Sequence, residues 1–128
     1  MEAAVQARKA KLKREADAKI ARVESTAEKT ANKIRLEGKN AAEKARKEGY
    51  KQADALVDAA GNNPIKKRAA KIAANKLKKE TDKQVQKIED NANKNADRVI
   101  QCSKEETEKI RKEYDKKIEK VTTENIGR

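Results

Sequence analysis

The sequence is poor in the residues that build an ordinary globular core. Its 128 residues include no histidine, tryptophan or phenylalanine, only two tyrosines, one cysteine and one proline. Hydrophobic residues make up 35% of the chain and aromatic residues 2%, whereas apolar residues fill nearly half of a typical domain. A thick central core is therefore excluded. The chain is either disordered or forms long helices that bury one narrow stripe.

The missing residue types also restrict the chemistry. Cys102 has no histidine or second cysteine with which to form a catalytic pair, a metal site or an intrachain disulfide. The carboxylates stand beside lysines, and nothing predicts a pocket that would shift their pKa values. We therefore predict that the protein is not an enzyme and binds no cofactor and no metal ion. Because Cys102 precedes the predicted interface residue Ser103, we expect it to be half-buried.

Targeting signals are missing as well. No apolar run is long enough to cross a bilayer, and the first residues lack the apolar centre of a signal peptide. The compartment is left open between two alternatives. An envelope or periplasmic location would follow if a signal segment lies upstream of Met1, and a cytoplasmic location would follow otherwise.

Charged residues and residues that favour helices are abundant instead. Charged residues make up 44% of the chain, and alanine, glutamate, lysine and arginine all favour helices. Small and aliphatic residues recur with the spacing 4, 4, 3, which repeats every 11 residues. In the first half these residues are Leu12, Ala16, Ile20, Val23, Ala27, Ala31, Ile34, Gly38, Ala42, Ala45, Gly49, Ala53, Leu56 and Ala60. In the second half they are Leu77, Thr81, Val85, Ile88, Ala92, Ala96, Val99, Ser103, Thr107, Ile110, Tyr114, Ile118 and Val121.

The repeat and the one proline predict an all-α chain of two long helices in an antiparallel hairpin. Gly61 suits the left-handed position that ends a helix, Asn63 suits an N-cap and Pro64 suits the first helical position. Eleven residues in three turns predict a hendecad coiled coil that is nearly straight or weakly right-handed. We expect one domain, 1–128, with arm one at 2–60, the turn at 61–64 and arm two at 65–125, each arm about 90 Å long.

The two arms can be aligned by pairing residues whose numbers have a constant sum. A sum of 126 places Gly49 against Leu77 and Gly38 against Ile88, so that large residues face small ones in each layer. The glycines, which weaken a helix by about 1 kcal/mol each, would then make room for the larger partners. A sum of 127 pairs Ala42 with Val85, Ala31 with Ala96 and Ile20 with Thr107.

An interface between only two helices buries little apolar area, and its stabilisation is correspondingly small at about 25 cal/mol per Å². We therefore expect either a marginally stable monomer or, as the favoured alternative, self-association to a dimer in a four-helix arrangement. Two further stripes could form that contact, although both are equally well read as ordinary exposed residues. One comprises Tyr50, Val57, Ile65, Ala69 and Ile72. The other comprises Ala3, Ala7, Ala10, Ala18 and Ala21.

The net charge of +12 is concentrated around the turn. Residues 44–79 hold eleven cations and three acids, which gives +8, whereas residues 80–128 are neutral. This basic tip is a candidate anion-binding site, although a solvated charged face would look the same. Anionic lipid, an envelope polymer, an acidic protein and nucleic acid are all open as partners; the two tyrosines and the lack of a known motif do not favour nucleic acid. The tip cations are Lys44, Arg46, Lys47, Lys51, Lys66, Lys67, Arg68, Lys71, Lys76, Lys78 and Lys79.

Three resemblances follow from the repeat. The stretch TAEKTANKIRLEGKNAAEKARKEG resembles the 11-residue repeats of group 3 late-embryogenesis-abundant proteins, and also those of synucleins and exchangeable apolipoproteins. Those proteins are often disordered, whereas this sequence carries Leu, Ile and Val in complementary layers, which favours a folded hairpin. The hendecad pattern is similar to the peripheral stalks of rotary ATPases. The stretch NPIKKRAAKIAANKLKKETDKQ resembles Ala/Lys-rich helical proteins of Bacteroidetes-type bacteria, often predicted lipoproteins, which would imply an envelope location.

Taken together, these features predict a non-enzymatic structural or interaction protein, a coiled-coil rod that acts as a spacer or scaffold. Its main partners would be proteins, including a second copy of itself. Binding of an anionic lipid, polymer or nucleic acid through the basic tip is the alternative.

Overall fold

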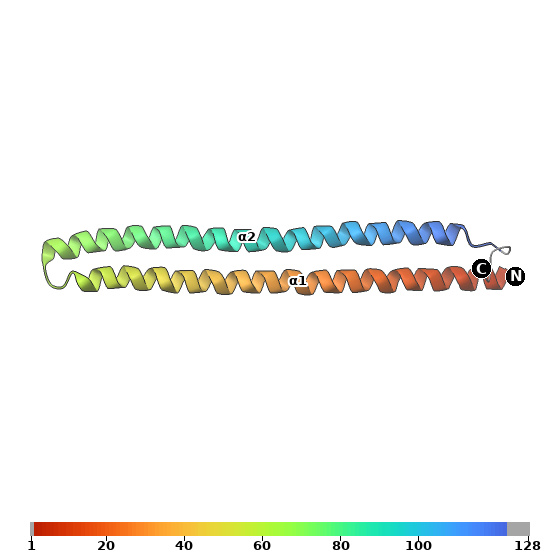
Figure 1. The fold of residues 1–128 in the computed structure, drawn as a ribbon, viewed down its shortest axis with the longest axis horizontal. Helices are drawn as coiled ribbons and strands as arrows, with labels where there is room; N and C mark the ends of the chain where they lie inside the picture. The colour runs from red at the N-terminus through yellow and green to blue at the C-terminus, as the bar shows by residue number, and fades with distance from the viewer. Residues whose placement is uncertain (1, 123–128) are drawn as a thin grey trace. The chain divides into compact units, whose positions relative to one another are not determined.

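Two helices account for nearly all of the residues that the computed structural model describes, which are 2–122 (Figure 1). Helix α1 spans Glu2–Ala59 and helix α2 spans Pro64–Glu119. The prediction of an all-α chain whose two helices pack together is confirmed, and no strand occurs in this part of the chain. Helix α2 ends earlier than the predicted 125: residues 120–122 are not helical, and 123–125 lie outside the described residues.

The chain leaves α1 and enters α2 through the predicted turn residues. Gly61 has a φ of +61°, the left-handed conformation that glycine adopts without a steric penalty. The side-chain oxygen of Asn63 accepts hydrogen bonds from the backbone N–H groups of Ile65 and Lys66, at 3.0 and 3.2 Å. These are two of the N–H groups that the start of a helix leaves without partners. The predicted N-cap at Asn63 and helix start at Pro64 are therefore confirmed.

The described chain divides into two compact units. Unit 1 consists of residues 2–31 and 97–122, and unit 2 consists of residues 32–96 with the turn. In each unit a segment of α1 lies beside an antiparallel segment of α2 (Figure 1). The expected single domain over 1–128 stays a prediction.

The helices of unit 2 approach each other closely at the two helical glycines. A Cβ atom added to Gly38 would overlap the Ala92 Cβ and lie 3.7 Å from the Ala92 Cα. A Cβ added to Gly49 would lie 2.8 Å from the Cβ of Thr81 and closer still to its outer side-chain atoms. The glycines therefore do make room, but for Ala92 and Thr81.

This geometry corrects the predicted register. Gly38 with Ala92 and Gly49 with Thr81 both sum to 130, not 126, so α2 is displaced by about one helical turn from the predicted pairing. Small residues face small ones at these layers, and Leu77 is only half-buried. The sequence pattern did not distinguish the two registers, because residues one turn apart lie on the same helix face. Either register therefore places small and aliphatic residues of the two helices opposite each other. The pairs that sum to 127 stay a prediction.

Burial separates the small residues from the larger ones in unit 2. Its buried residues are Gly38, Ala42, Ala53, Ala74, Thr81, Val85 and Ala96. All of them except Val85 are small. The larger members of the repeat are half-buried, as at Ile34 and Ile88, or exposed, as at Leu56, which is 42% exposed. The centre of this interface is therefore narrow and the aliphatic residues flank it.

Unit 1 has the bulkier core. Leu12, Ala16 and Tyr114 form a buried cluster, and Ile110, Ile118 and Val121 pack against it. Arg111 and Asp17 form an ion pair on the surface nearby, at 3.3 Å. Because α1 contributes Leu12 and Ala16, and α2 contributes Ile110, Tyr114 and Ile118, this cluster fixes the two segments against each other. Leu12 and Tyr114 share this cluster with Ala16, and the predicted pairing of Leu12 with Tyr114 in one layer stays a prediction.

Candidate anion-binding surface

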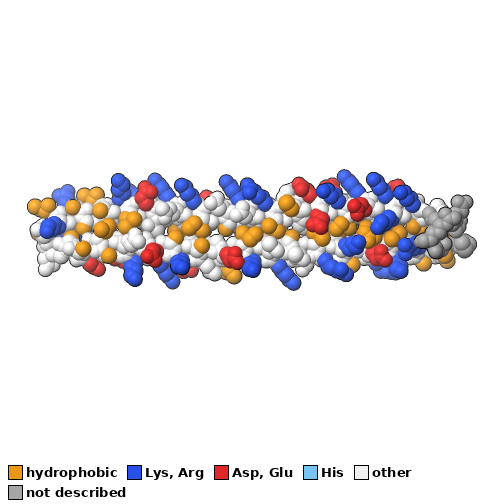
Figure 2. All heavy atoms as spheres, viewed as in Figure 1, with side chains coloured by type: hydrophobic (Ala, Val, Ile, Leu, Met, Phe, Trp, Pro, Cys, Tyr) orange, Lys and Arg blue, Asp and Glu red, His pale blue; other side chains and the backbone are white. Residues whose placement is uncertain are grey.

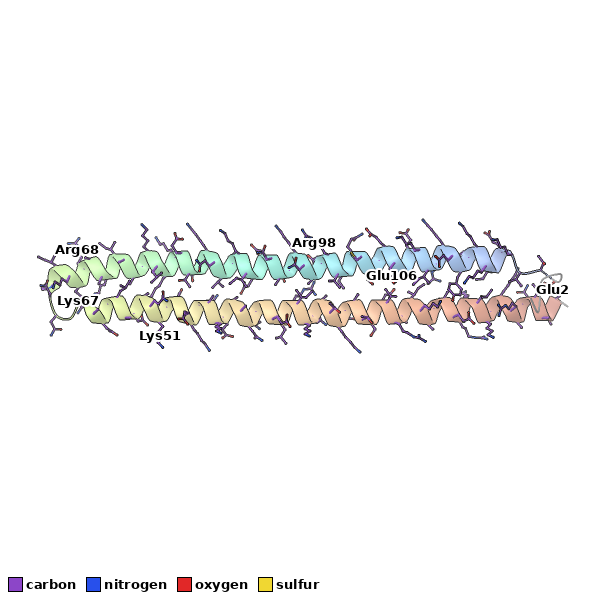
Figure 3. All side chains as sticks on the ribbon, viewed as in Figure 1. Glu2, Lys51, Lys67, Arg68, Arg98 and Glu106 are labelled. Atoms are coloured by element: carbon purple, nitrogen blue, oxygen red, sulfur yellow. The ribbon has the colours of Figure 1, made fainter. Side chains whose placement is uncertain are left out.

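All eleven cations of the predicted basic tip lie in unit 2, on the segments that lead into and out of the turn. Ten of them are exposed, and Lys78 is half-buried. Figure 3 shows Lys51 projecting from α1 on the side away from α2, and Lys67 and Arg68 at the first turn of α2. The cations therefore belong to one unit and are open to solvent.

The two helices contribute differently to this charge. On α1, residues 44–59 hold four cations and three acids, and Lys44, Lys47 and Lys51 share a surface hollow of about 300 Å³ with Glu43 and Glu48. On α2, residues 64–79 hold seven cations and no acid. The first sixteen residues of α2 therefore carry the larger net positive charge, since no acid of the same segment offsets it.

One of the seven cations is engaged within unit 2. The Lys78 ammonium lies 3.9 Å from an Asp54 carboxylate oxygen and 5.5 Å from the centre of the Tyr50 ring. The Tyr50 hydroxyl donates a hydrogen bond of 2.9 Å to Asp82. These four side chains bridge the two helices beside Gly49, so Lys78 belongs to the interface between the helices as much as to the basic tip.

This cluster alters the acidity of Tyr50. The hydrogen bond to Asp82 holds the phenol proton, and partial burial and the negative charge of Asp82 disfavour the phenolate. Together they raise the pKa of Tyr50 above 10.0. Sequence reasoning missed Asp82 as its partner, because the pairing sum of 126 brings Tyr50 opposite residue 76; the observed register brings Asp82 within reach.

A related arrangement occurs in unit 1. The ammonium groups of Lys19 and Lys117 lie 5.2 and 4.6 Å from the centre of the buried Tyr114 ring. The hydrogen bond between Lys19 and the Tyr114 hydroxyl raises the pKa of Lys19 above 10.5. Both tyrosines of the chain thus sit under lysines at the interface, where the ring faces attract the cations.

An apolar groove of about 540 Å³ lies between the two segments of unit 1 and was not predicted. Val23, Ala27, Val99 and Ser103 form part of its lining, and Arg98 and Glu106 also line it. Figure 3 labels Arg98 and Glu106 on α2. Cys102 also lines it and is exposed, so the expectation that Cys102 is half-buried is wrong. One residue along a helix turns a side chain by about 100°, which places Cys102 outside while Ser103 is buried.

Among residues 2–122, no group of three or more Cys, Asp or Glu side chains is placed to hold a metal ion. Neither helix is apolar enough over a sufficient length to cross a membrane.

Searches against protein-family models, curated proteins and solved structures find no match to this chain.

Proposed function

We propose that this chain is a non-enzymatic structural or interaction protein that acts as a spacer or scaffold. In this proposal α1 and α2 pair along their lengths as a hendecad coiled coil, nearly straight or weakly right-handed, and form a rigid rod. One observation carries the proposal: in unit 2, buried residues of α1 and of α2 recur at 11-residue intervals. They are Ala42 and Ala53 on α1, and Ala74, Val85 and Ala96 on α2. Such a repeat favours straight helices over a left-handed supercoil.

The test is a melting curve followed by circular dichroism in dilute buffer without lipid. A protein that serves as a spacer must be helical on its own, so we expect high helicity and one cooperative transition. A chain that is mostly disordered until a lipid is added would contradict the proposal.

The narrow interface leads us to propose in addition that the protein pairs with a second copy. A dimer stabilises the folded state in proportion to the logarithm of protein concentration. The melting temperature should therefore rise when the concentration is raised a hundredfold, and sedimentation should show twice the mass of the chain. A melting temperature independent of concentration, with a monomeric mass, would contradict self-association.

A second candidate function is binding of a polyanionic partner through the basic tip. The acid-free stretch 64–79, with seven cations, is the observation that favours it. Changing Lys66, Lys67, Arg68 and Lys71 to glutamate should abolish binding to anionic vesicles and to polyphosphate. The matched control changes four exposed lysines of unit 1 and alters the net charge equally. These are Lys104, Lys109, Lys112 and Lys116. Equal loss in both variants would show that only net charge matters, and would remove the tip as a site.

A further inference from the structure

The start of α2 exposes two large aliphatic side chains among its cations. Ile65 is 82% exposed and Ile72 is 65% exposed. They are seven residues apart, about two helical turns, and therefore lie on one face of α2. Ala74, which is buried, follows Ile65 by nine residues and so points about 180° away from it. Ile65 and Ile72 thus face away from the interface between the helices.

The same face is basic. Arg68, Lys76 and Lys79 lie within about 60° of Ile65 around the helix axis, and all three are exposed. Figure 2 shows hydrophobic and cationic side chains together at the end of unit 2 that carries the turn. We call the exposed face formed by Ile65, Arg68, Ala69, Ile72, Lys76 and Lys79 the α2 face.

Helix stability does not explain this placement of charge. The first turn of a helix favours acids, because its N–H groups leave a partial positive charge there, and each misplaced cation is unfavourable. The first turn of α2 has no acid, and Lys66, Lys67 and Arg68 follow Pro64 and Ile65 directly. An anionic partner would reverse this penalty, since the start of a helix and the cations would then act together.

We propose that the α2 face docks on a bilayer surface that contains anionic lipid; this inference rests on the second candidate function and narrows its partner. A polyanion such as nucleic acid would bind the cations, but it has no apolar surface against which the two exposed isoleucines could be buried. A bilayer surface takes both, because aliphatic side chains enter the boundary of the acyl chains while lysines and arginines stay beside the phosphates. The face would lie along the membrane without crossing it.

The test uses the full chain and vesicles of phosphatidylcholine with and without phosphatidylglycerol. The double variant Ile65→Ser/Ile72→Ser keeps every charge. We expect its affinity for the anionic vesicles to fall by about tenfold or more, since each isoleucine loses its burial in the membrane. Its binding to polyphosphate should equal that of the parent. The control Leu36→Ser removes another exposed aliphatic side chain of unit 2, one that is 58% exposed, and should change neither.

A fluorescence probe reports on insertion directly, because the chain has no tryptophan. Emission from an Ile72→Trp variant should shift to the blue when anionic vesicles are added, whereas emission from Leu36→Trp should not. Normal vesicle binding by the double serine variant, or no shift from Ile72→Trp, would overturn the bilayer proposal. If the four glutamate substitutions still abolished polyphosphate binding, the second candidate function would stand without it. Absence of any binding by the parent would overturn both.

Discussion

At the scale of single residues, the close packing of the two helices in unit 2 depends on two glycines, which have no side chain. Gly38 and Gly49 lie where a single methyl group would meet Ala92 or Thr81. In an open helix, glycine is about 1 kcal/mol less favourable than alanine. Its presence at both positions is explained by the close approach of the second helix.

We predict that Gly38→Ala destabilises the protein. The added methyl group would overlap the Ala92 side chain, and overpacking of this kind typically raises the free energy of the folded state by about 1–3 kcal/mol. This exceeds the gain of about 1 kcal/mol that alanine would bring to a free helix. Urea denaturation measures the difference. The double variant Gly38→Ala/Ala92→Gly should recover most of the loss. A more stable Gly38→Ala variant would mean that the helices do not meet at these residues.

The second residue-scale prediction concerns pH. The pKa of Tyr50 is raised above 10.0, first by its hydrogen bond to Asp82. The folded state therefore holds this proton more tightly than the unfolded chain does. The stabilisation is fully present below pH 10, the pKa of tyrosine in an unfolded chain, and is lost as the pH rises through the higher folded-state pKa.

Ultraviolet titration of the phenol in a Tyr114→Phe background isolates Tyr50. We expect its pKa to lie above 10 and to fall toward that value in Asp82→Ala. An unchanged pKa in Asp82→Ala would show that the hydrogen bond of 2.9 Å does not control this group.

At the scale of elements, local signals predicted the turn well and the register poorly. Gly61, Asn63 and Pro64 act through their own backbone and side-chain chemistry, so the sequence alone located the turn. The register depends on which of two neighbouring layers the second helix occupies, and residues one turn apart are alike in size. In unit 1, Tyr114 lies in one buried cluster with both Leu12 and Ala16, so that cluster does not decide between the two registers.

The N-cap of α2 yields a prediction at this scale. Asn63→Ala removes the acceptor of two backbone hydrogen bonds and should lower the free energy of unfolding by about 1 kcal/mol. Thermal melting would show a drop of several degrees. Asn62→Ala changes an exposed neighbour outside the cap and serves as the control. Equal effects of the two substitutions would contradict the capping role of Asn63.

At the scale of the whole molecule, the sequence predicted the position of the charge more closely than its use. The eleven tip cations all lie in unit 2, yet the acids of α1 offset the charge of its four cations and Lys78 pairs with Asp54. The remaining positive charge of the tip lies at the start of α2, where residues 64–79 include no acid. The 4, 4, 3 repeat left Ile65 and Ile72 outside the predicted interface, and both are exposed. The repeat did not indicate whether a partner covers them.

The central proposal is that the two helices pair along their lengths into a rigid rod. Small-angle X-ray scattering of the dilute chain tests it most directly. Helices of nearly 60 residues predict a maximum dimension of about 90 Å and the scattering profile of a thin rod. A disordered chain of this length would instead give a radius of gyration of about 37 Å without a rod-like profile, and a compact globule one of about 14 Å. Either of those results would contradict the account.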